Sequence, residues 1–215
     1  KAISEDLAIF IANYFRMQKQ VYDTCRAARY FSPFENILGY YEEPNGQIPN
    51  TYSQYANIAM ETLLLKCQPG MEKATGLKLY PAYTYARIYK KGDELKRHKD
   101  RFSCEISTTM NLGGDKWPIY IEPNPKLGKE GKNGYESAYT EGVKVELKPG
   151  DMLVYKGNIC EHWRDQFEGT DCAQVFLHYN NQKTKGSKKN LFDGRKHLGL
   201  PSWWKDKTDH TDTKY

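Results

Sequence analysis

The chain has 215 residues, with 32 basic and 27 acidic side chains, a formal net charge of +5 and 39% apolar residues. This length predicts a single domain, residues 1–215. The mild positive charge is weak support for a nucleic-acid partner, because a solvated lysine-rich surface has the same balance. Five widely spaced cysteines exclude a disulfide framework and predict reduced thiols in a cytoplasmic protein. No apolar run approaches the length of a membrane span, so no membrane partner is expected.

The first part of the chain, residues 1–78, is predicted to be a helical support for the rest. Ser4 is a suitable N-cap for a first helix. Apolar side chains then recur at helical spacing at Leu7, Phe10, Ile11, Tyr14 and Phe15.

A second helix is expected after a Ser53 cap, and residues 32–50, between the two helices, are expected to form a loop. The apolar stripe of this helix consists of Tyr55, Ile58, Ala59, Thr62 and Leu65. Pro69 is expected to open a short third helix that Gly76 ends.

From Leu79 the apolar period changes to two, which is typical of strands. Strands are expected at residues 83–89, 104–112, 118–122, 143–147, 152–155 and 172–179. Residues 123–142 are expected to form a long mobile loop that lies as a lid over the substrate. The core is predicted to occupy residues 79–182, and residues 183–215 are predicted to form a C-terminal tail.

Helices followed by many short strands predict an α+β protein, with helices packed on one side of an all-β core. The spacing of these strands fits an eight-stranded, cupin-like jelly roll.

Two imidazoles and one carboxylate have the spacing of a metal site. His98 and Asp100 are two residues apart, so on a strand both side chains face the same way. His162 follows 64 residues later (162 − 98) and must be brought close by the fold. Two histidines and one carboxylate form the ligand set of non-haem Fe(II) oxygenases, which leaves coordination positions open. His178 is the alternative third ligand, although a hydrogen-bonded core histidine is its expected role.

The sequence around these ligands resembles a known family. The pattern Tyr89-x2-Gly92-x5-His98-x-Asp100-Arg101, followed by the segment Pro149–Tyr155 and then His162, is similar to that of 2-oxoglutarate- and Fe(II)-dependent oxygenases of the prolyl 4-hydroxylase-like type. The resemblance covers about Leu79 to Tyr179. Small oxygenases of phages and bacteria also look similar.

The resemblance implies a distorted double-stranded β-helix and a dioxygenase that uses Fe(II), 2-oxoglutarate and O2, with ascorbate as a stimulant. Such an enzyme hydroxylates a C–H bond and releases succinate and CO2. The implied substrate is a prolyl residue in a peptide or protein. Within this family a tyrosine at the position of Tyr89 contacts 2-oxoglutarate.

One position departs from the family pattern. A lysine or arginine is expected about ten residues after the distal histidine, where it binds the C5 carboxylate of 2-oxoglutarate, but this chain has Cys172 there. Arg164 and Arg87 are the alternative anchors, since a guanidinium can bind a carboxylate through two hydrogen bonds. Arg164 is the preferred one. Gln174 is expected to add a neutral hydrogen bond.

Two other functions remain open. A nucleic-acid oxygenase, such as a base demethylase, would use the same metal chemistry but would need a basic groove around the site. A non-catalytic, cupin-like binding module would neither hold iron nor turn over 2-oxoglutarate.

Overall fold

The computed structural model describes residues 1–32, 35–132 and 134–205. Its helices are α1 (Glu5–Ala27), α2 (Ile58–Thr75) and the 3-10 helices η1 (Phe102–Cys104), η2 (Ser187–Gly194) and η3 (Ser202–Trp204). Its strands are β1 (Tyr40–Tyr41), β2 (Tyr52–Tyr55), β3 (Leu79–Lys90), β4 (Leu95–His98), β5 (Ile106–Gly114), β6 (Ile119–Ile121), β7 (Lys129–Gly131), β8 (Gly134–Glu136), β9 (Val143–Val145), β10 (Met152–Tyr155), β11 (His162–Arg164) and β12 (Asp171–Asn181).

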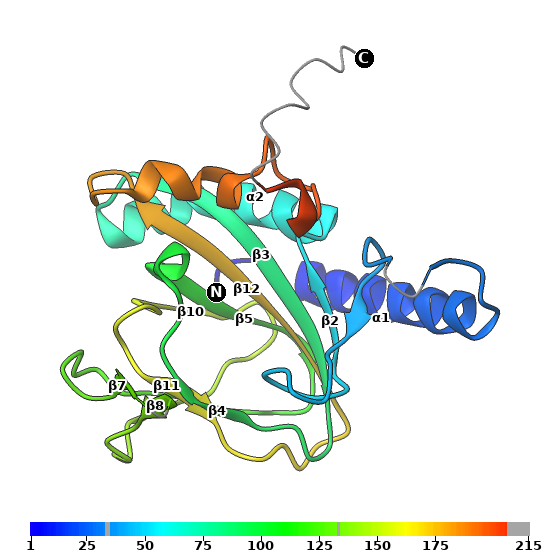
Figure 1. Ribbon diagram of the computed structural model, residues 1–215, viewed down its shortest axis with the longest axis horizontal. Helices are drawn as coiled ribbons and strands as arrows, with labels where there is room; N and C mark the ends of the chain where they lie inside the picture. The colour runs from blue at the N-terminus through cyan, green and yellow to red at the C-terminus, as the bar shows by residue number, and fades with distance from the viewer. Residues whose placement is uncertain (33–34, 133, 206–215) are drawn as a thin grey trace.

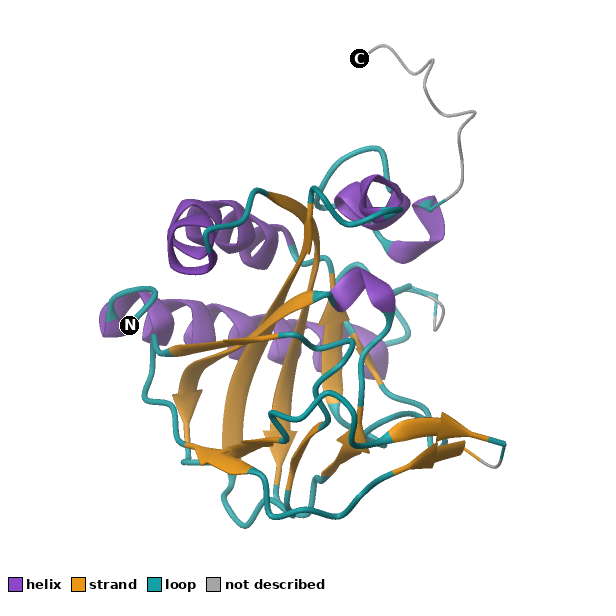
Figure 2. Cartoon of the chain, turned by 90° about the vertical axis from the view of Figure 1, so that its left-hand side faces the viewer, coloured by secondary structure: helices purple, strands orange, loops and turns teal. Residues whose placement is uncertain are grey.

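The strands form antiparallel sheets. The large sheet has the order β1-β2-β3-β12-β5-β10, and the small sheet has the order β4-β11-β6-β9. Helices α1 and α2 pack on one face of the large sheet, mainly against β3, β5 and β12, and Figures 1 and 2 show this helical layer. The expected α+β class, with helices on one side of a β core, is confirmed. Among the described residues, none of the helices is long and apolar enough to cross a membrane.

Strand β12 shows how alternation along the sequence divides the interior into two layers. Ala173, Val175 and Leu177 belong to the core that the large sheet shares with the helices. Cys172 and Phe176 point the other way and belong to a second core with Tyr89, Leu95, Trp117 and Phe167. Because successive side chains of a strand face opposite sides, one strand contributes to both layers. The second layer is the one that adjoins the candidate site.

The buried face of α1 differs in part from the predicted one. Ile11 and Phe15 are buried as predicted, but Phe10 is 70% exposed and Tyr14 is 37% exposed. Two small residues, Ala8 and Ala12, are buried instead. Their small side chains let the helix lie close to β5, and a Cβ added at Gly113 would be only 3.6 Å from the Cβ of Ala12.

The predicted boundaries of the second helix were wrong. Residues 52–55 form strand β2, and α2 begins after Asn57, whose side-chain oxygen accepts a hydrogen bond from the backbone N–H of Met60. The helix also continues through Pro69 to the predicted end at Gly76. A proline within a helix leaves the carbonyl four residues earlier without its N–H donor. Here that residue is Leu65, which is half exposed.

Two predicted loops contain strands. Strands β1 and β2 join the edge of the large sheet beside β3, so residues 1–78 are more than a helical support. Within residues 123–142, strands β7 and β8 pair as a hairpin. Residues 187–194 of the expected tail form η2, which contacts β3, and the tail residues 206–215 lie outside the described part of the chain.

Phenylalanine-to-alanine substitutions test which face of α1 is buried. Phe15→Ala should lower the free energy of unfolding by about 3–5 kcal/mol, because it leaves a cavity in the core. Phe10→Ala should change it by no more than about 0.5 kcal/mol, because that ring is largely in solvent. Urea unfolding followed by circular dichroism measures both. Equal destabilisation by the two variants would contradict this orientation of the helix.

Candidate metal centre

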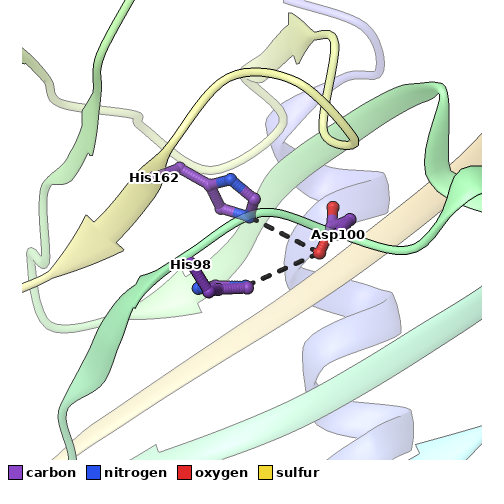
Figure 3. Close-up of side chains that lie close together, drawn as sticks. All are labelled: His98, Asp100 and His162. Atoms are coloured by element: carbon purple, nitrogen blue, oxygen red, sulfur yellow. Dashed lines mark ion pairs between the residues drawn. The ribbon is translucent and has the colours of Figure 1, made fainter. Parts of the chain in front are cut away.

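His98, Asp100 and His162 come together at one end of the small sheet. His98 is the last residue of β4, Asp100 follows two residues later, and His162 opens β11. Strands β4 and β11 pair antiparallel with His98 directly opposite His162. The Nε2 atoms of His98 and His162 lie 3.5 Å and 3.6 Å from Oδ1 of Asp100. Figure 3 shows the three side chains pointing toward one another.

The backbone orients both imidazoles. Nδ1 of His98 lies 2.7 Å from the carbonyl oxygen of Lys96, and Nδ1 of His162 lies 3.0 Å from that of Cys160. A carbonyl oxygen only accepts hydrogen bonds, so each Nδ1 carries a proton, and in the neutral form of each imidazole the lone pair lies on Nε2. This is how proteins prepare histidines to bind a metal.

Asp100 is held as an ionised carboxylate. Burial alone would raise its pKa, but His162 and then His98 hold the pKa of Asp100 well below its usual range. Its backbone N–H donates to the carbonyl of Gly157 at 2.8 Å. A side chain at Gly157 would collide with Oδ2 of Asp100, so this close approach requires glycine. The carboxylate therefore keeps its charge and its position between the imidazoles.

His178, the alternative third ligand, lies on the other side of Asp100. The hydroxyl of Ser107 lies 3.2 Å from Oδ2 of Asp100 and 3.0 Å from Nδ1 of His178. Burial lowers the pKa of His178 to about 4, so its imidazole is neutral at pH 7. A second cluster of possible ligand atoms belongs to Asp100, Cys104 and His178. Its atoms lie within 4.8 Å of one another, as do those of His98, Asp100 and His162. Burial raises the pKa of the Cys104 thiol to about 12, so the second cluster offers a neutral thiol.

A cavity of about 260 Å³ opens beside the ligands. Asp100, His98 and His162 form part of its wall. The other lining side chains include Gln47, Tyr83, Tyr85, Arg87, Tyr155 and Phe176. Most of these side chains are aromatic, and the guanidinium of Arg87 is ion-paired with Glu42. The cavity can therefore enclose a small organic group next to the ligand atoms.

Arg164 and Arg87 differ in their partners. Arg164 is almost completely buried and forms no ion pair with any described carboxylate. Its guanidinium donates one hydrogen bond to the carbonyl of Trp117 and another, of 3.1 Å, to the hydroxyl of Thr109. Its Nε has no partner among the described residues. Burial lowers the pKa of Arg164, as expected for a cation without a counter-ion. Arg87, in contrast, is already neutralised by Glu42.

Tyr89 lies close to this unpaired cation. Its ring packs against the indole of Trp117 at 4.6 Å between centroids, and the guanidinium of Arg164 lies 5.0 Å from the centre of the same indole. The hydroxyl of Tyr89 is buried without a described hydrogen-bond partner. Gln174 Oε1 lies 3.5 Å from Arg164, and Gln174 Nε2 lies 3.2 Å from Sγ of Cys172. The structure thus brings Tyr89, Arg164 and Gln174 close together outside the wall of the cavity, whereas Arg87 lies in that wall.

The loop at residues 123–142 does not lie over this cavity. In the described part of the loop no residue contributes to the cavity wall. Arg97 donates to the carbonyl of Thr140 and Lys99 donates to the carbonyl of Gly128, both at 2.7 Å. Arg97 and Lys99 flank His98 in the sequence, so their side chains lie on the opposite face of the chain from His98. The loop therefore packs on the outer face of the strands that carry His98 and His162. The proposed lid over the substrate is therefore not seen.

Two residues at the cavity were missed from the sequence: Gln47, which lies in its wall, and Glu42, which binds wall residues. Both lie around the turn between β1 and β2, where the composition predicted only a loop. Glu42 accepts hydrogen bonds from Arg87 and, at 2.9 Å, from the hydroxyl of Tyr85. No local pattern distinguishes such residues, because strand pairing between β2 and β3 places them at the site.

Comparisons with known proteins identify the fold. No protein-family model and no curated protein sequence matches the chain. Among solved structures, AviO1 from Streptomyces viridochromogenes Tue57 aligns with a TM-score of 0.56 and 12% identity over 86% of this chain and 89% of AviO1. HygX from Streptomyces hygroscopicus, solved with nickel, 2-oxoglutarate and hygromycin B bound, gives a TM-score of 0.50 and 14% identity over 67% of this chain and 74% of HygX.

The α-ketoglutarate-dependent non-haem epimerase SnoN, from nogalamycin biosynthesis, also has a TM-score of 0.50, with 13% identity over 64% of this chain and 63% of SnoN. At such identities the similarity shows a shared fold and nothing more specific. The resemblance predicted from the sequence is confirmed at that level: the chain has the fold of 2-oxoglutarate-dependent non-haem metalloproteins.

Alanine variants test which histidine completes the metal site. His98→Ala, Asp100→Ala and His162→Ala should each abolish stoichiometric Mn²⁺ binding, because each removes one of three ligands. His178→Ala should keep the stoichiometry and weaken affinity by at most about 10- to 100-fold, the usual cost of losing a group that orients a ligand. Equilibrium dialysis with elemental analysis measures both quantities. Binding that survives in His162→Ala but disappears in His178→Ala would reverse the assignment.

Proposed function

We propose that this protein is an Fe(II)- and 2-oxoglutarate-dependent dioxygenase that hydroxylates a C–H bond. The observation that carries the proposal is the convergence of the three ligand atoms of His98, Asp100 and His162 at the wall of a cavity. Two imidazoles and one carboxylate suit a divalent non-haem iron and leave coordination positions for other ligands. Bound Fe(II) would supply the activation of O2, coupled to the conversion of 2-oxoglutarate to succinate and CO2.

The unpaired cation supports a dicarboxylate cosubstrate. A buried guanidinium without a counter-ion costs free energy, and a carboxylate that binds there would remove that cost. Arg164 is such a group, and it lies two residues after His162 on the same strand. We assign the C5 carboxylate of 2-oxoglutarate to Arg164, and we propose that the buried hydroxyl of Tyr89 donates a hydrogen bond to an oxygen atom of the cosubstrate. This arrangement explains how a chain with Cys172 at the usual basic position can bind the same cosubstrate.

The aromatic side chains around Arg164 and Tyr89 exclude water. Trp117 and Phe167 pack against each other with their ring centroids 5.1 Å apart, and Trp117 also covers Arg164 and Tyr89. A dry pocket strengthens the attraction between a guanidinium and a carboxylate. The ionised Asp100 supplies the one negative charge of the ligand set.

The strand order supports a double-stranded β-helix. Eight of the strands can be numbered one to eight in chain order: β3, β4, β5, β6, β9, β10, β11 and β12. In this numbering the large sheet has the order 1-8-3-6 and the small sheet has the order 2-7-4-5. Such alternation between two facing sheets is the arrangement of an eight-stranded jelly roll. The presence of nickel and 2-oxoglutarate in HygX is consistent with the same cofactors here.

A prolyl residue in a peptide or protein is the substrate that we propose first. The aromatic side chains Tyr83, Tyr85 and Phe176 line the cavity beside the ligands and suit an apolar ring. A nucleic-acid substrate is less well supported, because the cavity wall contains one described guanidinium, that of Arg87, and Glu42 neutralises it. SnoN is described as an epimerase, so proteins of this fold also carry out reactions other than hydroxylation.

Replacement of Arg164 tests the cosubstrate assignment. Arg164→Gln should raise the KM for 2-oxoglutarate by about 10- to 150-fold, since charged hydrogen bonds contribute about 1.5–3 kcal/mol. Succinate formation at saturating Fe(II) gives the KM, and circular dichroism checks the fold. Arg87→Gln is the matched control and should affect stability more than the KM, because it leaves Glu42 buried without its cation. A raised KM in Arg87→Gln alone would assign the carboxylate to Arg87.

A substrate screen separates the candidate functions. Proline-containing peptides, single-stranded nucleic acids and free amino acids are incubated with the Fe(II)-loaded protein and 2-oxoglutarate, and succinate is measured. We expect stimulation by one or more peptides. Stimulation by nucleic acid alone would favour the demethylase alternative. A protein that binds no iron and forms no succinate would be a binding module.

A further inference from the structure

The side chain of Gln47 forms a hydrogen bond with Nε2 of His98, the nitrogen that we assign to the metal. Nε2 of Gln47 lies 3.1 Å from Nε2 of His98, and Oε1 of Gln47 accepts a hydrogen bond from Nη1 of Arg87 at 2.9 Å. A guanidinium only donates hydrogen bonds, so its contact fixes the oxygen end of the amide toward Arg87. The amide NH₂ group therefore faces His98 and donates to its lone pair.

A metal ion and Gln47 compete for that lone pair. Nδ1 of His98 already donates to the carbonyl of Lys96, so Nε2 is the nitrogen that remains for a ligand bond. Metal–imidazole bonds are about 2.0–2.1 Å long. Nε2 has a single lone pair, and the hydrogen bond that the Gln47 amide donates at 3.1 Å occupies it. The amide must move away before His98 can bind a metal.

The loop that carries Gln47 has space to move. A hollow of about 540 Å³ on one side is lined in part by Glu43, Gly46 and Gln47, and a hollow of about 640 Å³ on the other is lined by residues 44–49. The base of the loop is fixed, since the N–H groups of Ile48 and Asn50 both donate to Glu42 at 3.0 Å. The tip can therefore shift without unpacking the buried base.

We propose that Gln47 is a gate and positioning residue for the metal site. Its amide caps Nε2 of His98, and metal binding displaces the amide into the adjacent cavity. Arg87 stays in place through its ion pair with Glu42 and keeps the displaced amide at the cavity wall. The freed NH₂ group is then a hydrogen-bond donor for an oxygen atom of the substrate. This inference rests on the proposed function, because it requires a metal at His98.

The Mn²⁺ affinity of Gln47 variants tests the gating role of Gln47 independently of catalysis. Gln47→Ala removes the amide, and Gln47→Met removes the hydrogen bond while keeping a side chain of similar length. Both should bind Mn²⁺ about 2- to 10-fold more tightly than the wild type, since a hydrogen bond contributes about 0.5–1.5 kcal/mol. Asn45→Ala, an exposed residue of the same loop, is the matched control and should bind like the wild type. Equilibrium dialysis of the full chain without 2-oxoglutarate gives the affinities.

The outcomes separate the gate from the proposed function. The gate would be overturned if both Gln47 variants bound Mn²⁺ with the affinity of the wild type. The metal site would still stand if the wild type bound Mn²⁺ tightly and His98→Ala did not. An equal increase in Asn45→Ala would also overturn it, because general loosening of the loop would then be the cause. Failure of the wild type to bind Mn²⁺, Fe²⁺ or Co²⁺ would overturn both proposals.

Discussion

The pairing of strands β4 and β11 is the constraint on which the site depends. Each strand is short, and the register places His98 directly opposite His162. Because side chains on a strand alternate, a shift of one residue would turn both imidazoles to the outer face and bring Arg97, Lys99 and Trp163 inward. The outer face is therefore also specified: the ring of Trp163 packs under the guanidinium of Arg97, 3.4 Å from its centre, and Lys99 holds the carbonyls of the neighbouring loop.

The charges around the site follow from the same arrangement. Asp100 lies between two imidazoles and remains ionised despite burial. Behind it, Arg164 is buried among Trp117, Thr109 and Gln174 without a carboxylate. Buried ions in folded proteins normally have partners, and Arg87 with Glu42 shows the usual solution a short distance away. Arg164 is thus a buried cation that has no described counter-ion and lies two residues after His162 on the same strand.

Much of the fold was predictable because its strands alternate strongly. The strand at residues 152–155 was predicted with its observed bounds, and the side chains at positions 83, 85, 87 and 89 were correctly separated from those at 84, 86 and 88. The helices were less predictable, because α1 has apolar residues on more than one face and the sheet selects the face with Ala8 and Ala12. Strand β2 was missed because Tyr52–Tyr55 owes its structure to pairing with β3 rather than to its own pattern.

The sequence by itself determined the ligand types, their spacing and the absence of a basic residue at Cys172, since these are properties of local order along the chain. Only the tertiary structure shows that Arg87 has a carboxylate partner whereas Arg164 has none among the described residues, because that partner is Glu42, a residue 45 positions from Arg87 in the sequence. It also decided that Gln47 reaches His98 across 51 positions. Both contacts depend on strand pairing at long range, which side-chain periodicity does not encode.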